Sequence, residues 1–231
     1  MIDFSFTEKQ KDLFNYVVAF AREELNINVQ ADDEAQRFPR EKWKKCGTLK
    51  LQGLCIAKEY GGAGLDALST SIALEALGYA STDNGLNFSI GAHLLACVLP
   101  IALHGSKEQK EKYMPSLCNG ELIACNAMTE PGSGSNAFDM KTLAKKNGDG
   151  YIITGNKVFL TNAPVADVFL LYASTDPQKG FYGGISAFLV ENGAGIDYSL
   201  VKKMGLHTSS MGHVNFLDVQ LRNEAMLAKE G

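Results

Sequence analysis

The amino-acid sequence predicts an α+β multidomain protein, with an N-terminal all-α domain at residues 1–120 and a β domain at residues 121–231. Apolar residues recur at helical spacing through the first part, whereas β-rich runs separated by glycine and asparagine turns follow from Leu122 onward. Helices that precede strands, rather than alternating with them, favour two domains or an α+β arrangement. A length of 231 residues is enough for either.

The composition is that of a soluble globular protein, with 45% hydrophobic and 21% charged residues. The net charge of −4 gives no basic surface, so we expect no nucleic-acid partner. The longest apolar run, Leu94–Leu103, is too short to span a bilayer, so we expect no membrane partner. Residues 1–4 show no secretory signal. Five cysteines without a C-x-x-C pair and four histidines without metal-ligand spacing predict cytoplasmic localisation and no metal site.

The helical domain begins with a capping box, in which Thr7 caps the helix and Gln10 reaches back. Pro39 is expected to begin a short helix. Residues Gly53–Gly64 are expected to form an irregular connection between helices. The buried face of the first helix is predicted to hold Leu13, Phe14, Val17, Val18, Ala21 and Leu25.

The centre of the helical domain is predicted at Leu86–Leu103, because this segment is apolar nearly all round. Asp83 is its expected N-cap, and Ser106 caps a further helix with a solvated charged face. His93 and Cys97 lie four residues apart on one face of the central helix. A Cys/His pair at this spacing is compatible with a nucleophile or a metal ligand, but two ordinary core residues are the favoured interpretation.

Strands are predicted by β-rich runs bounded by turn residues. A Gly155-Asn156 pair lies between two of these runs and predicts a β-hairpin with a two-residue turn. The runs are Leu122–Met128, Tyr151–Thr154, Val158–Thr161, Val168–Tyr172, Ala187–Val190 and Val214–Val219.

One stretch, Asn126–Asn136, reads N-A-M-T-E-P-G-S-G-S-N, an apolar run that leads into a Gly/Ser-rich loop. Backbone N–H groups in such a loop can bind an anion, and serine hydroxyls add donors, so the loop could hold phosphate. Taken alone, a Gly/Ser-rich stretch is more often an ordinary turn. It is neither a Walker loop nor a dinucleotide fingerprint, because no lysine follows the glycines and no βαβ unit surrounds it.

A second motif, G-N-K-V-F-L-T-N at Gly155–Asn162, follows M-T-E-P-G-S-G-S at Met128–Ser135. The pair resembles the acyl-CoA dehydrogenase family, with Thr129 and Thr161 at the family's spacing. The resemblance covers essentially the whole chain and implies a helical N-terminal domain and a β-barrel- or β-sandwich-like middle domain. The family's C-terminal helical domain is not matched, so we expect a truncated chain.

The resemblance implies an FAD-dependent acyl-thioester dehydrogenase, a flavoprotein oxidoreductase of fatty acid metabolism. Its implied partners are an acyl-CoA or acyl-carrier-protein thioester and an electron-transfer flavoprotein or other acceptor, and the full-length protein is implied to be a homo-oligomer. The family's catalytic base is a glutamate of the C-terminal domain. We therefore assign no catalytic residue and expect this piece alone to be inactive. Glu130 is expected to serve as a charge at a helix N-terminus or to hydrogen-bond within its loop, rather than act as the base.

The resemblance also implies site residues. Met128 and Thr129 would contact the pyrimidine side of the flavin, and Phe159 would pack on the ring face. Thr161 would lie near N5. The full set implied for the cofactor is Asn126, Met128, Thr129, Gly134, Ser135, Phe159, Leu160 and Thr161. The implied substrate-binding residues are Ser135, His93 and Cys97, the last two on a helix that lines the family's acyl pocket.

Two departures from the family pattern leave the substrate open. Asn136 stands where aspartate is common, and Met204–Ser209 replaces a stretch that often carries arginine. Ala92–Pro100 and Thr161–Phe169 look similar to biosynthetic members that oxidise acyl or prolyl groups on carrier proteins. The alternatives are therefore a dehydrogenase of carrier-bound thioesters, an acyl-CoA oxidase, a non-catalytic flavin- or DNA-binding protein on the same scaffold, and a structural subunit.

Overall fold

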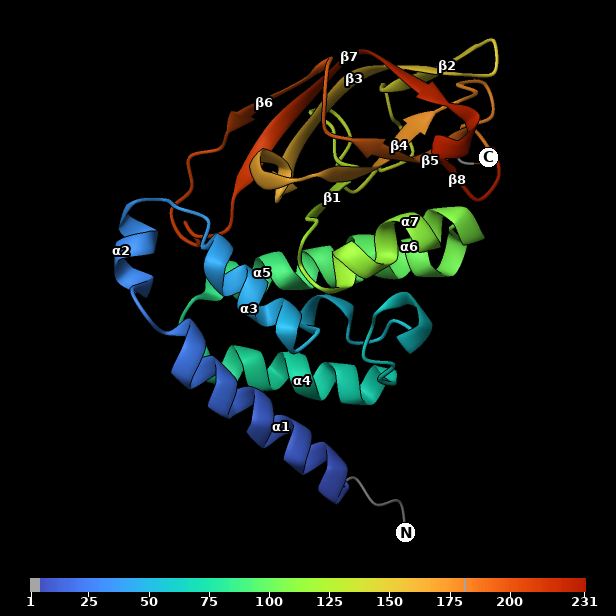
Figure 1. Ribbon diagram of the computed structural model, residues 1–231. Coiled ribbons are helices and arrows are strands. Elements are labelled where there is room, and N and C mark those ends of the chain that lie inside the picture. The colour runs from blue at the N-terminus through green and yellow to red at the C-terminus, as the bar shows by residue number, and fades with distance from the viewer. Residues whose placement is uncertain (1–4, 181) are drawn as a thin grey trace.

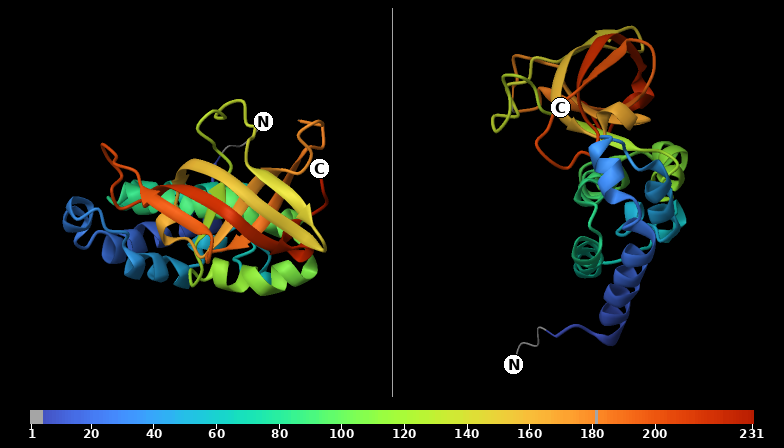
Figure 2. Two further views of the ribbon diagram at one scale, coloured as in Figure 1. Left: turned by 90° about the horizontal axis from the view of Figure 1, so that it is seen from above. Right: turned by 90° about the vertical axis from the view of Figure 1, so that its left-hand side faces the viewer.

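The computed structural model describes residues 5–180 and 182–231, in which a helical domain is followed by a β domain (Figure 1). Helices α5, α6 and α7 lie directly against the sheet, and α1 and α4 lie on their far side (Figure 1). A side view shows the β domain on top of the helical domain and α1 pointing away from it (Figure 2). The predicted order of helices before strands is therefore confirmed.

The described α-helices all precede the strands. They are α1 (Glu8–Phe20), α2 (Val29–Glu34), α3 (Arg40–Thr48), α4 (Ala67–Ala80), α5 (Asn84–His93), α6 (Leu99–His104) and α7 (Lys107–Cys118). The strands are β1 (Ala124–Ala127), β2 (Leu143–Asn147), β3 (Gly150–Thr161), β4 (Val168–Ser174), β5 (Ile185–Glu191), β6 (Ile196–Leu200), β7 (Met211–Arg222) and β8 (Met226–Leu227).

The predicted helix caps are confirmed. Thr7 accepts a hydrogen bond from the Gln10 N–H at 3.3 Å, and the Gln10 side chain accepts one from the Thr7 N–H at 2.9 Å. Asp83 accepts from the Leu86 N–H at 3.0 Å at the start of α5. Ser106 begins α7 with a second capping box. Each cap satisfies N–H groups that have no partner within the helix.

The central helix runs continuously over Asn84–His104 through a π-helical turn at Leu94–Val98. Pro100 follows this turn and has no N–H for the carbonyl of Ala96, four residues back, so the turn absorbs the irregularity. By length and composition alone the helix is long enough to cross a membrane, although the core helix of a soluble protein meets the same criteria. Its buried residues pack against both domains, so it forms the central layer.

The β domain is one sandwich-like sheet of order β6-β7-β3-β2-β4-β5-β8, with β1 parallel to β4. Among the described strands, β6 and β8 end the sheet and do not pair with each other, so it is not closed into a barrel. Its own core is distinct from a second apolar cluster that lies between α6, α7 and strands β1, β4 and β5. This second cluster joins the domains and fixes β1 against the helices.

The hairpin predicted at Gly155-Asn156 is wrong. Residues 150–161 form one long strand, β3, which pairs with β7 from Gly150–Arg222 to Thr161–Met211. Two irregularities, one after Ile153 and one after Lys157, bend the strand without reversing it. A Cβ on Gly155 would lie 2.4 Å from the Thr142 hydroxyl oxygen, so glycine permits a close approach here and not a turn.

Candidate functional site

The two sequence motifs meet where β1 ends and β3 approaches its own end. The Val158 N–H donates to the Thr129 carbonyl at 2.9 Å, and the Lys157 ammonium donates to the Met128 carbonyl at 2.9 Å. The side chains of Met128 and Thr129 are half-buried. Residues about thirty positions apart in the chain are therefore held as neighbours by hydrogen bonds.

Glu130 and Lys157 form a buried ion pair beneath this junction, with Nζ 2.8 Å from Oε1 and both side chains almost without exposure. Burial by itself raises the pKa of Glu130, but hydrogen bonds from Lys157 and two main-chain N–H groups outweigh it and hold the pKa below its usual value. The expectation that Glu130 hydrogen-bonds within its loop is confirmed.

The Gly/Ser-rich loop leaves β1 and lies partly in solvent, where it projects from the sheet (Figure 2). Its base is closed by a short bridge between Glu130 and Ser133, whose hydroxyl donates to the Asn136 carbonyl at 2.6 Å. Ser133 is buried, whereas Gly134 and Ser135 are exposed. The structure therefore places the two predicted residues of this loop where a ligand can reach them.

Phe159 is presented at the surface in a strained backbone conformation. Its φ is +57°, which is uncommon for a residue other than glycine, and its side chain is 60% exposed. The His213 ring holds it in place: the ring centroids are 5.1 Å apart, and the Phe159 N–H donates to Nδ1 at 3.3 Å. Phe159 is therefore a surface residue near Thr129 and not part of the core.

The two residues after Phe159 have different environments. The side chain of Leu160 is buried in the core of the β domain, so only its main chain is available to a cofactor, and its predicted contact stays a prediction. Thr161 is half-buried at the end of the strand. The adjacent Asn162 ties this end to α5, because its amide donates to the Ser89 carbonyl at 3.1 Å.

Asn126 has a structural task. Its side-chain amide donates to the Ala96 carbonyl at 2.9 Å. In a regular α-helix that carbonyl would accept from residue 100, which here is proline and has no N–H. The donating end of the Asn126 amide is therefore engaged by the central helix, which counts against its predicted contact with a cofactor.

His93 and Cys97 are buried, and the structure shows no surface of either that a substrate could reach, so their contact with a substrate stays a prediction. The Ala124 N–H donates to Nδ1 of His93 at 2.9 Å, and Nε2 lies 3.0 Å from the Leu117 carbonyl. Burial lowers the pKa of His93 to about 4, so the ring is neutral and joins β1 to α7. Cys97 is 1% exposed, and burial raises its pKa well above the usual range. Both are core residues, as the sequence alone favoured.

The loop between β6 and β7 is bound to the helical domain, which the sequence did not predict. Asp33 on α2 accepts hydrogen bonds from the main chain and ring of His207, at 3.1 and 2.9 Å. The Thr208 hydroxyl donates to Asp83 at 2.5 Å, and the Ser209 hydroxyl lies 3.0 Å from that of Ser89. The loop thus connects α2 and α5 to the strand that carries His213.

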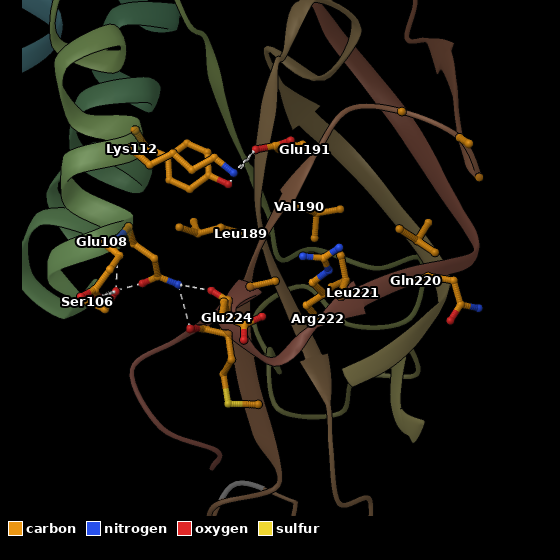
Figure 3. A pocket seen from close by; sticks show the side chains of 18 of the residues that line it. Ser106, Glu108, Lys112, Leu189, Val190, Glu191, Gln220, Leu221, Arg222 and Glu224 are labelled. Carbon is orange, nitrogen blue, oxygen red and sulfur yellow. Dashed lines mark hydrogen bonds and ion pairs between the residues drawn. The ribbon is translucent and has the colours of Figure 1, made fainter. Parts of the chain in front are cut away.

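A separate groove of about 1180 Å³ opens between α7 and the sheet, at the end of the β3–β7 pair opposite the motifs (Figure 3). Three of its polar side chains pair with one another: the Lys112 ammonium and the Tyr113 hydroxyl lie 2.7 and 2.9 Å from the Glu191 carboxylate. The Gln109 amide donates to two main-chain carbonyls after β7. These groups satisfy each other, so the motif junction is the better candidate site.

Comparison with known proteins identifies the family of this chain. The family profile for the N-terminal domain of acyl-CoA dehydrogenases matches residues 7–121, and the profile for the middle domain matches residues 125–219. The chain belongs to the acyl-CoA dehydrogenase family. Within that family it is 40% identical to a short-chain-specific acyl-CoA dehydrogenase of Clostridium acetobutylicum and 39% identical to an L-prolyl-[peptidyl-carrier protein] dehydrogenase of a Serratia species. Each alignment covers all of this chain and 60% of the relative.

Solved structures give the same result. The structure described as the FAD complex of PigA superimposes with a TM-score of 0.96 at 39% identity, and covers all of this chain and 60% of its own. Butyryl-CoA dehydrogenase from Megasphaera elsdenii superimposes with a TM-score of 0.92 at 34% identity. This superposition covers 100% of this chain and 61% of the butyryl-CoA dehydrogenase chain. The fold of acyl-CoA dehydrogenases is thereby confirmed for this chain, which spans about 60% of the length of these relatives.

Proposed function

We propose that the chain carries the FAD-binding surface, and part of the thioester-binding surface, of an acyl-thioester dehydrogenase of fatty acid metabolism. The observation that carries this proposal is the meeting of Met128–Glu130 with Lys157–Thr161 at one place, through the bonds that Lys157 and Val158 donate. Membership of the family and the FAD in a structure of a 39% identical relative support it.

The exposed and half-buried groups at the junction fit a flavin. Phe159 offers an aromatic face for a planar ring, and the hydroxyls of Thr129 and Thr161 offer donors for its polar edge. Gly134 and Ser135 lie in an exposed loop suited to a phosphate. When bound, FAD supplies the redox chemistry by accepting hydride, and these residues bind and orient it. We assign no proton transfer to a residue of this chain.

The substrate class we propose is an acyl thioester, with coenzyme A as the carrier. A carrier-protein thioester is the second candidate, because two relatives at 39% and 38% identity are L-prolyl-[peptidyl-carrier protein] dehydrogenases. Ser135, exposed in the Gly/Ser-rich loop, is the residue we propose for contact with this substrate. An electron-transfer flavoprotein as acceptor, a homo-oligomeric state and cytoplasmic localisation stay predictions. All five cysteines are free thiols, which supports a reducing compartment.

An anaerobic titration of the product of the complete gene, loaded with FAD, tests this proposal. Bleaching of the oxidised flavin absorption band by short-, medium- or long-chain acyl-CoA would support the coenzyme A thioester and identify the chain length. Bleaching only by a prolyl or acyl carrier-protein thioester would support the second candidate. Bound FAD that no thioester bleaches would contradict the dehydrogenase and support a non-catalytic flavoprotein, and reduced flavin that reacts rapidly with oxygen would indicate an oxidase.

A further inference from the structure

Lys157 is the most completely buried charged side chain at the motif junction. It has no solvent exposure, and its ammonium has an acceptor for each proton. Nζ lies 2.8 Å from Oε1 of Glu130, 2.9 Å from the Met128 carbonyl oxygen and 3.8 Å from the sulfur of Met140. The first two are charge-assisted bonds to the loop that leaves β1, and the third is weak. The side chain therefore links β3 to this loop at two strong points.

Glu130 is equally well satisfied. Its Oε1 also accepts from the Thr142 N–H at 3.0 Å, and its Oε2 accepts from the Lys141 N–H at 2.6 Å. A buried ion pair is weak evidence for stability, because removing two charges from water costs about as much as their attraction returns. Two apolar side chains could fill this space, but they could not hold the Met128 carbonyl or the two N–H groups. The pair is better explained by what it fixes in place.

The main chain of Met128 and Thr129 is the segment that the pair fixes. The carbonyl of Met128 faces the Lys157 ammonium, and the carbonyl of Thr129 accepts from the Val158 N–H. Because both carbonyls are directed at β3, the orientation of each of the two peptide planes that flank Thr129 is fixed. Phe159 is the next residue on β3, so the same bonds set the separation between the Thr129 and Phe159 side chains.

We propose that Lys157 and Glu130 are positioning residues, which orient Met128 and Thr129 relative to Phe159 for flavin binding without touching the cofactor themselves. This inference rests on the proposed function, since it names how the flavin surface is held. A purely structural pair would contribute to folding alone. A positioning pair also controls the affinity for flavin and the electronic environment of the bound flavin. Its loss should therefore affect flavin binding even in a variant that leaves no unpaired charge buried.

The test compares Lys157→Met, Glu130→Gln and the double variant with the wild-type protein. Each single variant leaves one charge buried and unpaired, whereas the double variant is neutral and keeps similar side-chain shapes. Three properties are measured: the dissociation constant of FAD by flavin fluorescence, the absorption spectrum of bound FAD, and unfolding in urea. Lys112→Met is the matched control, because it breaks an exposed lysine–glutamate pair, 2.7 Å from Glu191, in the separate groove.

We expect both single variants to lose stability and FAD affinity together. The double variant regains most of the stability but binds FAD at least about tenfold more weakly, with a shifted flavin spectrum, because the Met128 carbonyl is no longer held. Lys112→Met leaves FAD affinity and spectrum unchanged. A double variant with wild-type affinity and spectrum would overturn the positioning role.

Two further outcomes are decisive. If the double variant does not fold, Lys157→Arg decides, because it keeps the charge but changes the reach and geometry of the donors. Weakened FAD binding by a folded Lys157→Arg supports positioning, and unchanged binding contradicts it. A wild-type protein that binds no FAD refutes the proposed function itself, and this outcome is distinct from a failure of Lys157 alone.

Discussion

Asp33 and His207 are paired across the two domains, with Nδ1 of His207 2.9 Å from Oδ2 of Asp33. The other ring nitrogen, Nε2, lies 2.9 Å from the Lys203 carbonyl oxygen. Both partners are acceptors, so the doubly protonated ring satisfies both contacts. The Asp33 carboxylate raises the pKa of His207 above 6.5, and the His207 hydrogen bond lowers that of Asp33 below 3.8, its ordinary value.

The first prediction concerns the pH dependence of this pair. The contribution of His207 to the free energy of unfolding is complete below its unfolded pKa of 6.5. It is lost as the pH rises through the higher pKa of the folded state. The contribution of Asp33 is present above pH 3.8 and is lost as the pH falls through the lower pKa of the folded state.

NMR titration of the ring protons should show His207 titrating above 6.5, and the Asp33→Asn substitution should lower the pKa of His207. His93, buried elsewhere, is the internal control and should not change. An unaltered His207 titration in Asp33→Asn would contradict the pairing.

The second prediction concerns His93. Its folded pKa of about 4 lies below the ordinary 6.5, so the unfolded chain binds a proton that the folded chain does not. Stability should therefore fall as pH decreases from 6.5 to 4, by about 3 kcal/mol from this residue. The His93→Gln side chain can still accept a hydrogen bond from Ala124 and donate one to Leu117. In this variant the part of the stability decrease at low pH that comes from His93 should disappear. Urea unfolding can be followed by fluorescence of Trp43, the single tryptophan, whose ring centroid is 5.1 Å from that of His93. An equal acid loss in both proteins would argue against the buried neutral ring.

The third prediction concerns the amide of Asn126. Asn126→Leu should lower the free energy of unfolding by about 1–2 kcal/mol, because the Ala96 carbonyl loses its side-chain donor. Pro100→Ala restores an N–H four residues after Ala96. In that background Asn126→Leu should cost less, and a double-mutant cycle by urea unfolding measures the difference. Additive effects would show that the two residues do not serve the same carbonyl.

The fourth prediction concerns Gly155. An alanine there would place Cβ 2.4 Å from the Thr142 hydroxyl oxygen and 2.6 Å from its Cα, so Gly155→Ala should destabilise the protein by about 1–3 kcal/mol. Gly132→Ala is the control, since nothing lies within 4 Å of the added carbon. Equal unfolding midpoints for the two variants would contradict the close approach of β3 to residue 142.

Local signals in the sequence predict most of the helices and the main strands, although α2 was not predicted. The caps at Thr7, Asp83 and Ser106 depend on residues three positions away, so they can be read from the chain. Strands β2 and β6 were not predicted, because in each only one residue is buried and no alternation shows. These strands depend on hydrogen bonds to their neighbours. Gly155-Asn156 has the local signature of a turn, but pairing with β7 along the whole strand overrides it.

The candidate site was predicted only in part. The spacing of Thr129 and Thr161, through its resemblance to a family, indicated that their motifs act together, and the structure makes these motifs neighbours. The role of Lys157 was missed, because a lysine in a strand normally faces solvent and its partner Glu130 is 27 residues away. The pairing of His207 with Asp33 spans 174 residues and leaves no local signal. The contacts predicted for Met128, Thr129, Gly134, Ser135, Phe159 and Thr161 stay predictions.

Hydrogen exchange of this chain with and without FAD tests the central claim most directly, because it locates the binding surface along the sequence. We expect slower exchange of amides in residues 126–136 and 157–162 when FAD is added. The groove lined by Lys112, Tyr113 and Glu191 should be unaffected and provides the internal control. Protection confined to that groove, or FAD binding without protection in either motif, would contradict the assignment of the motif junction as the flavin surface.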